Sequence, residues 1–312
     1  MHVGWPGRTR TVPAVCLLAL AGAAGCGGEP ASAPPHEPPP AAAPAVTEIA
    51  FGPSDGQVTM LAADGKAADL RSKAGMGVSG AGDDFAFDNT AASAMCGAGG
   101  RAGGPQLLGA KQSRFHSFTI QGWFRTPAGR PIGGGAVLVG HRGDSSGFEL
   151  YARTNGTLTL WFGDGLTGRQ VVTPQVYTES GRWVFFAVSF AMATKADPDN
   201  GVQAAPGRVT FYKGTARTPV RQVHTVASTE WMPVSGAGLG AFAIGARPDG
   251  SRAFRGRLDN IRIYHAADGT PPTEPLAGIV NLAALEKLRR TDLGSAALSP
   301  PKPAPKPKGK GR

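Results

Sequence analysis

The sequence is poor in cysteine, in aromatic side chains and in charge, and it lacks an apolar run long enough to span a membrane. Cysteine occurs three times in 312 residues, aromatic residues make up 7% and charged residues 17%. The N-terminal apolar run, residues 12–25, is shorter than the ~20 residues that a bilayer core requires. Cys16 lies inside that run and Cys26 follows it, so Cys96 would be the one ordinary thiol. These features argue against a transmembrane protein and against a disulfide-stapled scaffold.

What the N-terminus has instead is the pattern of an export signal. Arg8 and Arg10 precede the apolar run and small residues follow it, which predicts a signal peptide over residues 1–25. The ending Ala-Ala-Gly-Cys resembles a bacterial lipobox, in which Cys26 is lipidated, although Leu is commoner than Ala23 at the first position. The alternative is an ordinary secretory signal with an incidental cysteine. We expect an exported, membrane-anchored lipoprotein, at the outer membrane or cell surface if the organism has two membranes.

The segments on either side of the central region have no apolar periodicity. Residues 26–47 are rich in Pro and Ala, which predicts an extended tether, and residues 299–312 predict a basic, disordered tail. Removing Arg8, Arg10 and the five tail charges from the net charge of +10 leaves +3 for the rest. Because the basic excess does not belong to the folded part, we expect no nucleic-acid partner. The tail either contacts anionic envelope polymers or serves solubility alone.

Short runs of aromatic and β-branched residues, separated by Gly, Asp, Asn and Pro clusters, predict many strands between residues 48 and 275. Residues 183–190 (WVFFAVSF) are apolar on both faces, which indicates a central strand, and Thr154-Asn155-Gly156 predicts a tight hairpin turn. We therefore expect an all-β fold, a two-sheet antiparallel sandwich in one domain. The clearest runs are residues 118–124, 136–140, 148–153, 157–162, 183–190, 209–212, 242–245 and 254–264.

One helical pattern follows the strands. Leu282, Leu285, Leu288 and Leu293 recur at near-helical spacing, which predicts a short amphipathic helix within residues 276–298. We expect this helix to pack on the edge of the sandwich. The alternative is an independent interaction helix.

The order of these runs resembles the laminin G-like (LamG) domain of the concanavalin A-like lectin/glucanase superfamily. Residues 118–124 (FTIQGWF) are similar to that family's early strand, residues 183–190 to its W-x-x-V-A-V strand, and residues 209–214 (VTFYKG) to a strand ending in a glycine turn. Residues 243–264 are similar to the closing IG…F-x-G-x-I-D-D-V-R-I-Y signature, with Asn260 in place of the second Asp. The resemblance implies a jelly roll, and a family whose members bind glycans or proteins or, less often, cleave polysaccharides.

The acidic pattern that such cleavage requires is missing from the sequence. Retaining hydrolysis places two carboxyl groups about 5–5.5 Å apart. The glucanases of the superfamily carry them on an E-x-D-x-x-E strand, which does not occur in this sequence. Glu149, Glu179 and Glu230 each have no acid two residues away, and the histidines lack H-x-H or H-E-x-x-H spacing. We expect no enzymatic activity and assign no catalytic residue.

The resemblance implies a structural calcium ion, with Asp84, Asp88 and Asp259 as its ligands. Calcium takes hard oxygen ligands of this kind, although Asp in loops is also an ordinary turn residue. No other cofactor is required.

Two tryptophans are candidate stacking residues for a sugar. Trp161 lies opposite the apolar face of its strand, and Trp231 lies in a Pro-flanked loop. The alternative for both is ordinary packing. Trp123 and Trp183 belong to strands that the family uses for its core, and we expect them to be structural.

These patterns predict a binding module of the cell envelope, anchored to a membrane through lipidated Cys26, whose partner is a polysaccharide or an envelope protein. A structural module of a surface assembly is the second hypothesis, and a polysaccharide hydrolase or lyase is the third. Exposed aromatic residues in a groove would favour glycan binding, and an extended apolar patch would favour assembly. A close carboxylate pair from distant strands would favour catalysis.

Overall fold

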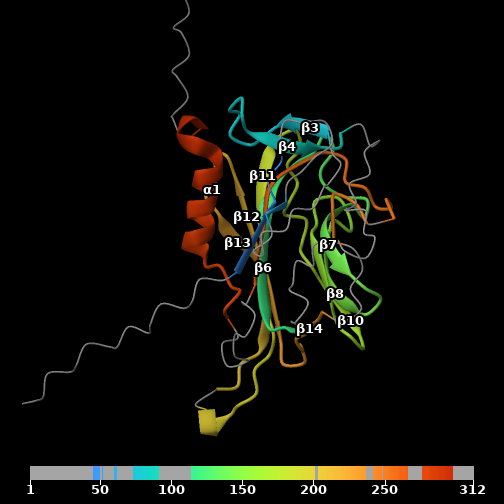
Figure 1. Ribbon diagram of the computed structural model, residues 1–312, viewed down its shortest axis with the longest axis vertical. Helices are drawn as coiled ribbons and strands as arrows, with labels where there is room; N and C mark the ends of the chain where they lie inside the picture. Colours follow the sequence, from blue (N-terminus) through green and yellow to red (C-terminus); the bar gives the residue numbers. More distant parts are fainter. Residues whose placement is uncertain are drawn as a thin grey trace, which may run out of the picture. The chain divides into compact units, whose positions relative to one another are not determined.

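The computed structural model confirms an all-β sandwich of antiparallel sheets with one C-terminal helix (Figure 1). It describes residues 45–49, 51, 60–61, 73–90, 114–200, 203–236, 242–247, 249–265 and 276–297. The expected signal peptide, Cys26, most of the tether, Cys96 and the basic tail lie outside the described residues. No helix within these ranges combines the length and apolar character that crossing a bilayer demands.

The larger sheet follows the order β13–β12–β11–β6–β16–β1–β2, and the pair β3–β4 joins it through β16. β11 lies between β6 and β12 and is buried on both faces from residue 184 onward, which confirms the predicted central strand. The strands are β1 (Ala45–Ile49), β2 (Met60–Leu61), β3 (Lys73–Met76), β4 (Phe85–Asp88), β6 (Ser117–Arg125), β11 (Trp183–Ala191), β12 (Gly207–Thr215), β13 (Arg221–Ser228) and β16 (Arg257–His265).

The smaller sheet follows the order β10–β9–β8–β7–β15, and a separate two-stranded pair joins β5 to β14. Its strands are β7 (Val137–Arg142), β8 (Ser146–Tyr151), β9 (Thr159–Asp164), β10 (Gly168–Val172) and β15 (Phe242–Ile244). The separate pair consists of β5 (Arg114–Phe115) and β14 (Val234–Ser235), and a short 3-10 helix covers Pro198–Asn200.

The connection between β8 and β9 is longer than the tight hairpin that the sequence predicted. The Thr157 N–H donates to the Thr154 carbonyl at 3.1 Å, and Gly156 has φ 75°. The strands, however, end at Tyr151 and resume at Thr159. The Asn-Gly pair therefore forms a turn within a loop instead of joining the strands directly, with Gly156 supplying the positive φ.

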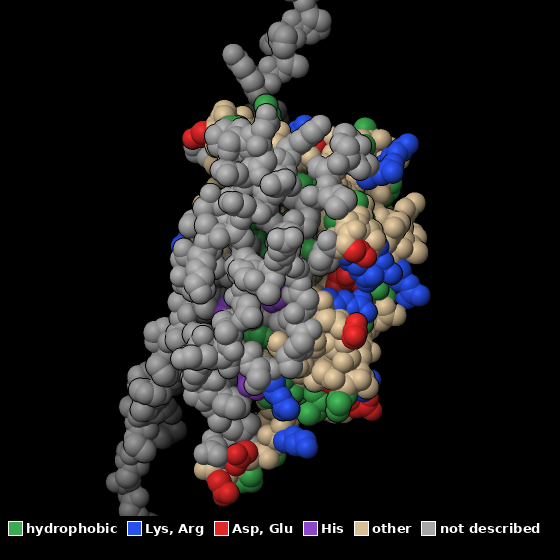
Figure 2. All heavy atoms as spheres, turned by 45° about the vertical axis from the view of Figure 1, so that its right-hand side comes forward, with side chains coloured by type: hydrophobic (Ala, Val, Ile, Leu, Met, Phe, Trp, Pro, Cys, Tyr) green, Lys and Arg blue, Asp and Glu red, His purple; other side chains and the backbone are tan. Residues whose placement is uncertain are grey.

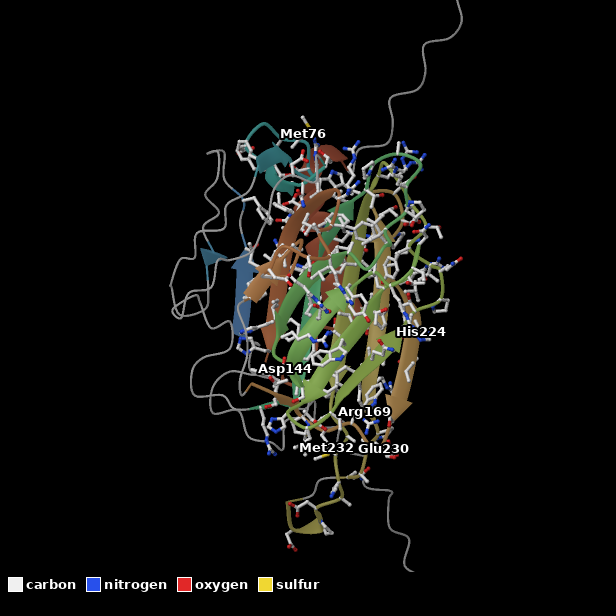
Figure 3. The ribbon with its side chains drawn as sticks, turned by 90° about the vertical axis from the view of Figure 1, so that its right-hand side faces the viewer. Met76, Asp144, Arg169, His224, Glu230 and Met232 are labelled. Atoms are coloured by element: carbon white, nitrogen blue, oxygen red, sulfur yellow. The ribbon has the colours of Figure 1, made fainter. Side chains whose placement is uncertain are left out.

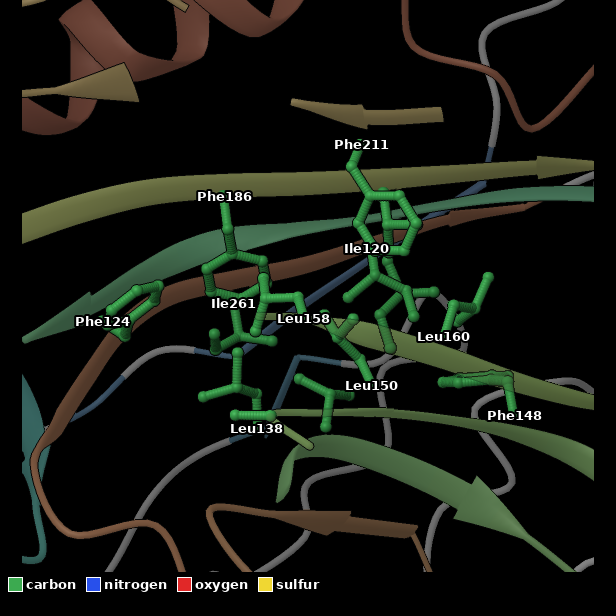
Figure 4. Packing of buried hydrophobic residues seen from close by; sticks show 14 of the residues in the cluster. Ile120, Phe124, Leu138, Phe148, Leu150, Leu158, Leu160, Phe186, Phe211 and Ile261 are labelled. Carbon is green, nitrogen blue, oxygen red and sulfur yellow. The ribbon is translucent and has the colours of Figure 1, made fainter. Parts of the chain in front are cut away.

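The inner faces of the two sheets meet in one apolar core (Figure 4). Ile120, Phe124 and Phe186 from the larger sheet point toward Leu150 and Leu160 from the smaller sheet, and all five are fully buried. Alternate residues of a strand face opposite sides, so these positions follow directly from the alternating pattern of the sequence. Each such side chain contributes ~1.5–3 kcal/mol on burial.

The helix α1 (Leu282–Ala297) begins and ends with recognisable caps. The Ala284 N–H donates to Asn281 Oδ1 at 2.9 Å, which satisfies one of the free N–H groups of the first turn. Near the other end, Gly294 has φ 66° and interrupts the helical backbone.

The helix packs on the outer face of the larger sheet, so the predicted packing on the sandwich edge is wrong. Leu285 and Leu293 lie in one buried cluster with Trp123 and Phe185, which come from the central strands β6 and β11. These strands are apolar on both faces, and the face opposite the main core needs a cover. The helix supplies that cover (Figure 1).

Candidate functional site

The outer face of the smaller sheet, which faces the viewer in Figure 3, carries a cluster of arginines around one buried carboxylate. Glu149 on β8 is 2% exposed and accepts hydrogen bonds from Arg247 Nε at 2.7 Å and Nη2 at 2.8 Å. Arg142 Nη1 donates to it at 3.2 Å, and Arg252 Nη1 lies 3.8 Å away. Glu149 therefore serves as an anchor for three arginines, not as an isolated acid.

Two aromatic rings lie under these arginines. The guanidinium carbon of Arg142 lies 3.7 Å from the centroid of the Trp161 ring, and that of Arg252 lies 5.5 Å from the Tyr151 ring. Trp161 lies on the outward face, opposite the apolar face of its strand, but it is only 8% exposed. The Arg142 guanidinium lies over the Trp161 ring, and the backbone of Gly168 lies close to it, so these two residues shield the ring from solvent. On this face, arginine side chains cover the aromatic rings, so neither ring is exposed for stacking against a sugar.

Trp231 is part of the main core. It is 6% exposed, and its ring lies 5.4 Å from Phe162 in an edge-on contact and 6.4 Å from Phe190 in a stacked one, both between centroids. Trp231 thus packs in the core, which was the alternative to sugar stacking, and its ring has no free face for a sugar.

Two of the three aspartates implied as calcium ligands come together at the turn between β3 and β4. Asp259 Oδ2 accepts the Val78 N–H at 2.7 Å, and its Oδ1 accepts the Asn260 N–H at 2.8 Å. Asp84 Oδ2 accepts the Ser79 N–H at 2.7 Å. Burial, followed by the nearby charge of Asp84, raises the pKa of Asp259 to about 8. Both carboxyl groups therefore lie beside the 78–79 backbone, and the negative charge of Asp84 disfavours a second charge on Asp259.

Asp88 is engaged elsewhere. Its Oδ2 accepts Arg257 Nε at 2.7 Å, and its Oδ1 accepts both the N–H and the hydroxyl of Thr90. Burial alone would raise the pKa of Asp88, but the hydrogen bonds from Thr90 and Arg257 lower it. Within the described ranges, no group of three or more His, Cys, Asp or Glu side chains is placed to hold a metal. A cation here would rest on Asp84 and Asp259, with backbone or water oxygens completing its shell.

The Asp84–Asp259 pair joins the β3–β4 turn to the distant strand β16, as a catalytic pair could, but its environment does not suit hydrolysis. Asp259 is 2% exposed, and both of its oxygens accept backbone N–H groups. A nucleophile or general acid must reach the glycosidic bond of the substrate. A carboxyl group enclosed in this way cannot do so.

Loops hollow the end of the sandwich where β6 stops and β11 starts. One pocket, of about 470 Å³, is lined by residues that include Thr126, Arg130, Asn155, Phe254 and Arg255. A second, of about 240 Å³, shares Thr126 with it. A third, of about 820 Å³, is bordered by residues 179–183 and 213–221. We call these the first, second and third end pockets.

Thr126 and Trp183 are the residues at this end that sequence reasoning missed. Thr126 is 5% exposed and lines the first and second end pockets, and among the described residues its buried hydroxyl has no hydrogen-bond partner. Trp183, expected to be structural, is half-buried and lines the third. No motif marks Thr126, and the W-x-x-V-A-V pattern marks Trp183 only as a structural residue. Each becomes notable as a pocket residue only where loops distant in sequence meet.

Comparison with known proteins gives one family and several distant structural neighbours. The laminin G family model described as Concanavalin A-like lectin/glucanases superfamily matches residues 102–268. No curated protein sequence matches the chain.

The solved structures that resemble the chain share little sequence with it. The Ruminococcus gnavus IT-sialidase CBM40 bound to α2,3-sialyllactose is 15% identical with a TM-score of 0.32, over 53% of this chain and 84% of that one. The botulinum neurotoxin serotype C1 binding domain is 11% identical with a TM-score of 0.46, over 80% of this chain and 52% of that one. The SAP-like pentraxin from Limulus polyphemus is 16% identical with a TM-score of 0.32, over 53% and 71%.

Proposed function

The chain belongs to the concanavalin A-like lectin/glucanase superfamily, and from this premise we propose that it is a non-catalytic module that binds a glycan at the cell envelope. The observation that carries the proposal is the first end pocket, which Thr126 lines with a buried hydroxyl that has no partner in the described part of the chain. Leaving a buried polar group unsatisfied costs ~1–3 kcal/mol. A hydroxyl of a bound ligand would remove that cost.

The lining of this pocket suits a sugar. Thr126 and Asn155 offer a hydroxyl and a side-chain amide, and Ile132 and Phe254 form an apolar wall. Ligand sites typically combine a mostly apolar lining with a few polar groups in ~300–1,000 Å³. The volume of about 470 Å³ falls in that range.

The surroundings of the acidic side chains support binding over catalysis. Glu149 is held by three arginines, and Asp259 is enclosed by backbone N–H groups. Neither side chain is free to act as the acid or nucleophile of a hydrolase. If polysaccharide incubated with the protein gained reducing ends, and a Glu149→Gln variant did not produce them, the non-catalytic part of the proposal would be wrong.

An assembly role has less support. Among the described residues, the exposed large hydrophobic side chains are Met76 on β3, Leu166 between β9 and β10, Met232 between β13 and β14, Leu276 before α1 and Leu282 at its start. Met76 and Met232 lie at opposite ends of the view in Figure 3. A permanent interface would call for a contiguous apolar patch instead.

We also propose that a calcium ion bridges Asp84 and Asp259. Two neighbouring carboxylates, one with its pKa raised to about 8, are destabilising without a cation. A divalent cation would replace the proton on Asp259 and attract both groups. Its role would be structural, joining the β3–β4 turn to β16.

The location of the module is proposed from the N-terminal sequence. The lipobox-like ending at Cys26 would attach acyl chains, and several chains would give durable anchoring at ~0.8 kcal/mol per buried CH₂. The Pro-rich tether would hold the sandwich away from the membrane. Mass spectrometry of the N-terminal peptide, together with a Cys26→Ser variant that is released from membranes, would test this.

The glycan proposal is tested by screening the full chain on a broad polysaccharide array, with calcium and with chelator. We expect saturable binding to one glycan class. An Ala253→Phe variant should abolish it, because Ala253 is a small residue in the lining of the first end pocket. Ala227→Phe, at an exposed position of β13, is the matched control and should bind normally. An array without binding in either condition would reject the proposal.

A further inference from the structure

Almost all of the charged side chains that line the end pockets are basic. The first end pocket contains Arg130 and Arg255, and the second contains Arg125 and Arg257. Among the described residues, no acidic side chain lines either pocket. The space-filling view shows basic side chains at this upper end of the molecule (Figure 2).

The third end pocket has the same character. Arg182, Arg217, Arg221 and Lys213 line it together with one acid, Glu179. That carboxylate is already neutralised by its ion pair with Lys213. The arginines of this pocket therefore face no free negative charge in its described lining.

The three pockets lie side by side. The first and second share Thr126. The Gly181 N–H donates to the Thr126 carbonyl at 2.9 Å, and Arg125 Nε donates to the Gly181 carbonyl at 3.1 Å. Trp183, which lines the third pocket, pairs with Arg125 across β11 and β6. The segment 179–183 thus connects the second pocket to the third.

In the second end pocket Arg257 is held by Asp88, but three arginines of the first and third end pockets differ from those elsewhere in the fold. Arg247 and Arg262 are each held by carboxylates. Arg130, Arg182 and Arg255 are exposed, and in the described part of the chain their side chains make no hydrogen bond or ion pair. Like charges gathered without counter-charges create a positive potential that attracts anions.

We infer that the end pockets together bind an acidic polysaccharide; this refinement rests on the proposed glycan-binding function and names the ligand class. Planar guanidinium groups match carboxylates and similar anions in two-point hydrogen bonds. Trp183 offers a partly exposed ring against which a sugar could pack. A row of pockets suits a polymer with repeated charges better than a single small anion.

The test uses the full chain in detergent and two pairs of polymers that differ in charge. Polygalacturonate is compared with its methyl-esterified form, and dextran sulfate with dextran. We expect at least one charged polymer to bind more than about tenfold tighter than its neutral partner, which corresponds to ~1.4 kcal/mol. Binding should weaken as salt is raised, because exposed charges are screened.

Charge reversals locate the site. Arg130→Glu with Arg255→Glu should weaken binding at least about tenfold, and Arg182→Glu with Arg217→Glu should also weaken it if the polymer spans the pockets. The matched control reverses Arg114 and Arg208, two exposed arginines at the opposite end of the sandwich. A second control replaces the four lysines of the tail by glutamine. Both controls should bind as the parent does.

Thr126→Val separates a ligand contact from a structural role. The change removes a buried hydroxyl for which the described residues provide no partner, so the melting temperature should stay the same or rise. Affinity for the charged polymer should nevertheless fall. A fall in both would mean that the hydroxyl stabilises the free protein.

The outcomes distinguish this inference from the proposed function. Equal binding of charged and neutral polymers, blocked by Ala253→Phe, would overturn the inference and leave the glycan proposal standing. Binding to anionic lipid vesicles without binding to any charged polysaccharide would overturn the inference as well. Failure to bind any polysaccharide would reject both. Loss of binding in the tail variant with retention in the Arg130/Arg255 variant would move the charge recognition to the tail.

Discussion

The two faces of the larger sheet are both buried along its central strands β6 and β11, but they are built differently. Phe185 and Phe186 are consecutive on β11 and fully buried, yet Phe186 points into the apolar core between the sheets and Phe185 lies beneath α1. The inner face packs against the strands of the smaller sheet, in which inward-facing and outward-facing residues alternate as they do in the larger sheet. The outer face packs against a helix that also brings charged groups under cover.

The polar groups of the outer face are concentrated around Asp292 on α1. Trp123 Nε1 donates to Asp292 Oδ2 at 2.9 Å, and Arg262 Nη1 donates to Asp292 Oδ1 at 2.8 Å. Burial raises the pKa of Asp292, and Arg262 opposes that shift. A purely apolar interface would permit several positions of the helix. The hydrogen bonds of Asp292 to Trp123 and Arg262, in contrast, form at only one position. The inner face thus contributes mainly to stability, and the polar groups of the outer face also fix the position of α1.

The largest effect of a single substitution is expected on the inner face. Phe186→Ala should lower the free energy of unfolding by about 4 kcal/mol, because the cavity lies between two sheets that cannot close over it. Phe185→Ala should cost about 1 kcal/mol less, because α1 can shift toward the space. Urea denaturation of both variants measures the difference. Equal losses would mean that the helix is held as rigidly as the second sheet, and the contrast between the faces would fail.

The next effect is expected at the buried ion pair. Asp292→Ala should cost about 3 kcal/mol, the lower end for breaking such a pair, because Arg262 keeps its second partner Glu48. Thr291→Ala, on the exposed side of the same helical turn, should cost less than about 0.5 kcal/mol. Urea denaturation gives both values, and limited proteolysis reports whether α1 is released. A cost below that of Thr291→Ala would show that the pair does not position the helix.

The inner face and its strands could be predicted from the sequence because their signal is local. Each of the eight predicted runs overlaps a strand of the structure, and the run at residues 183–190 is central as its two apolar faces indicated. The exposed strand β13 was missed because its residues carry little apolar alternation. The docking of α1 was predicted at the wrong place, because Asp292 and Arg262 give no sign in sequence that they will pair.

The candidate site could be predicted only in part, for a related reason. Trp161 was correctly placed on the outward face of its strand, but the sequence does not reveal that Arg142 covers it. The approach of Asp84 to Asp259 was implied by the family resemblance and depends on a turn about 175 residues away in sequence. Thr126 becomes distinctive only through what surrounds it. Features that depend on the meeting of loops have no local sequence pattern.

The third prediction concerns the acidic pair at the edge of the outer face. The folded protein holds the proton of Asp259 up to about pH 8, whereas an unfolded chain loses it near pH 4. The folded state therefore binds more protons in this window, and stability should fall as pH rises from about 4 to 8, by up to about 1.4 kcal/mol per unit. Thermal unfolding across this range, in chelator, measures the slope.

An Asp84→Asn variant and added calcium each test the same interaction between Asp84 and Asp259. The asparagine can still accept the Ser79 N–H while removing the charge beside Asp259, so the slope should become smaller. If calcium binds as proposed, it should raise the melting temperature of the parent at neutral pH and have little effect on this variant. A parent whose stability ignores both pH and calcium would contradict the coupling of Asp84 and Asp259.

The smallest effect is expected on the outer face of the smaller sheet, which has no helix and covers its aromatic rings with arginines. Arg142→Ala should remove the cover of Trp161 and cost about 1 kcal/mol, since Glu149 keeps its two-point contact with Arg247. Iodide should then quench more of the tryptophan fluorescence. Arg169→Ala, which breaks an exposed ion pair on the adjacent strand β10, should change neither quantity appreciably. Unchanged quenching in the Arg142 variant would mean that other groups cover the Trp161 ring. Arginines would then not shield the outer face of the smaller sheet in the way that α1 shields the outer face of the larger sheet.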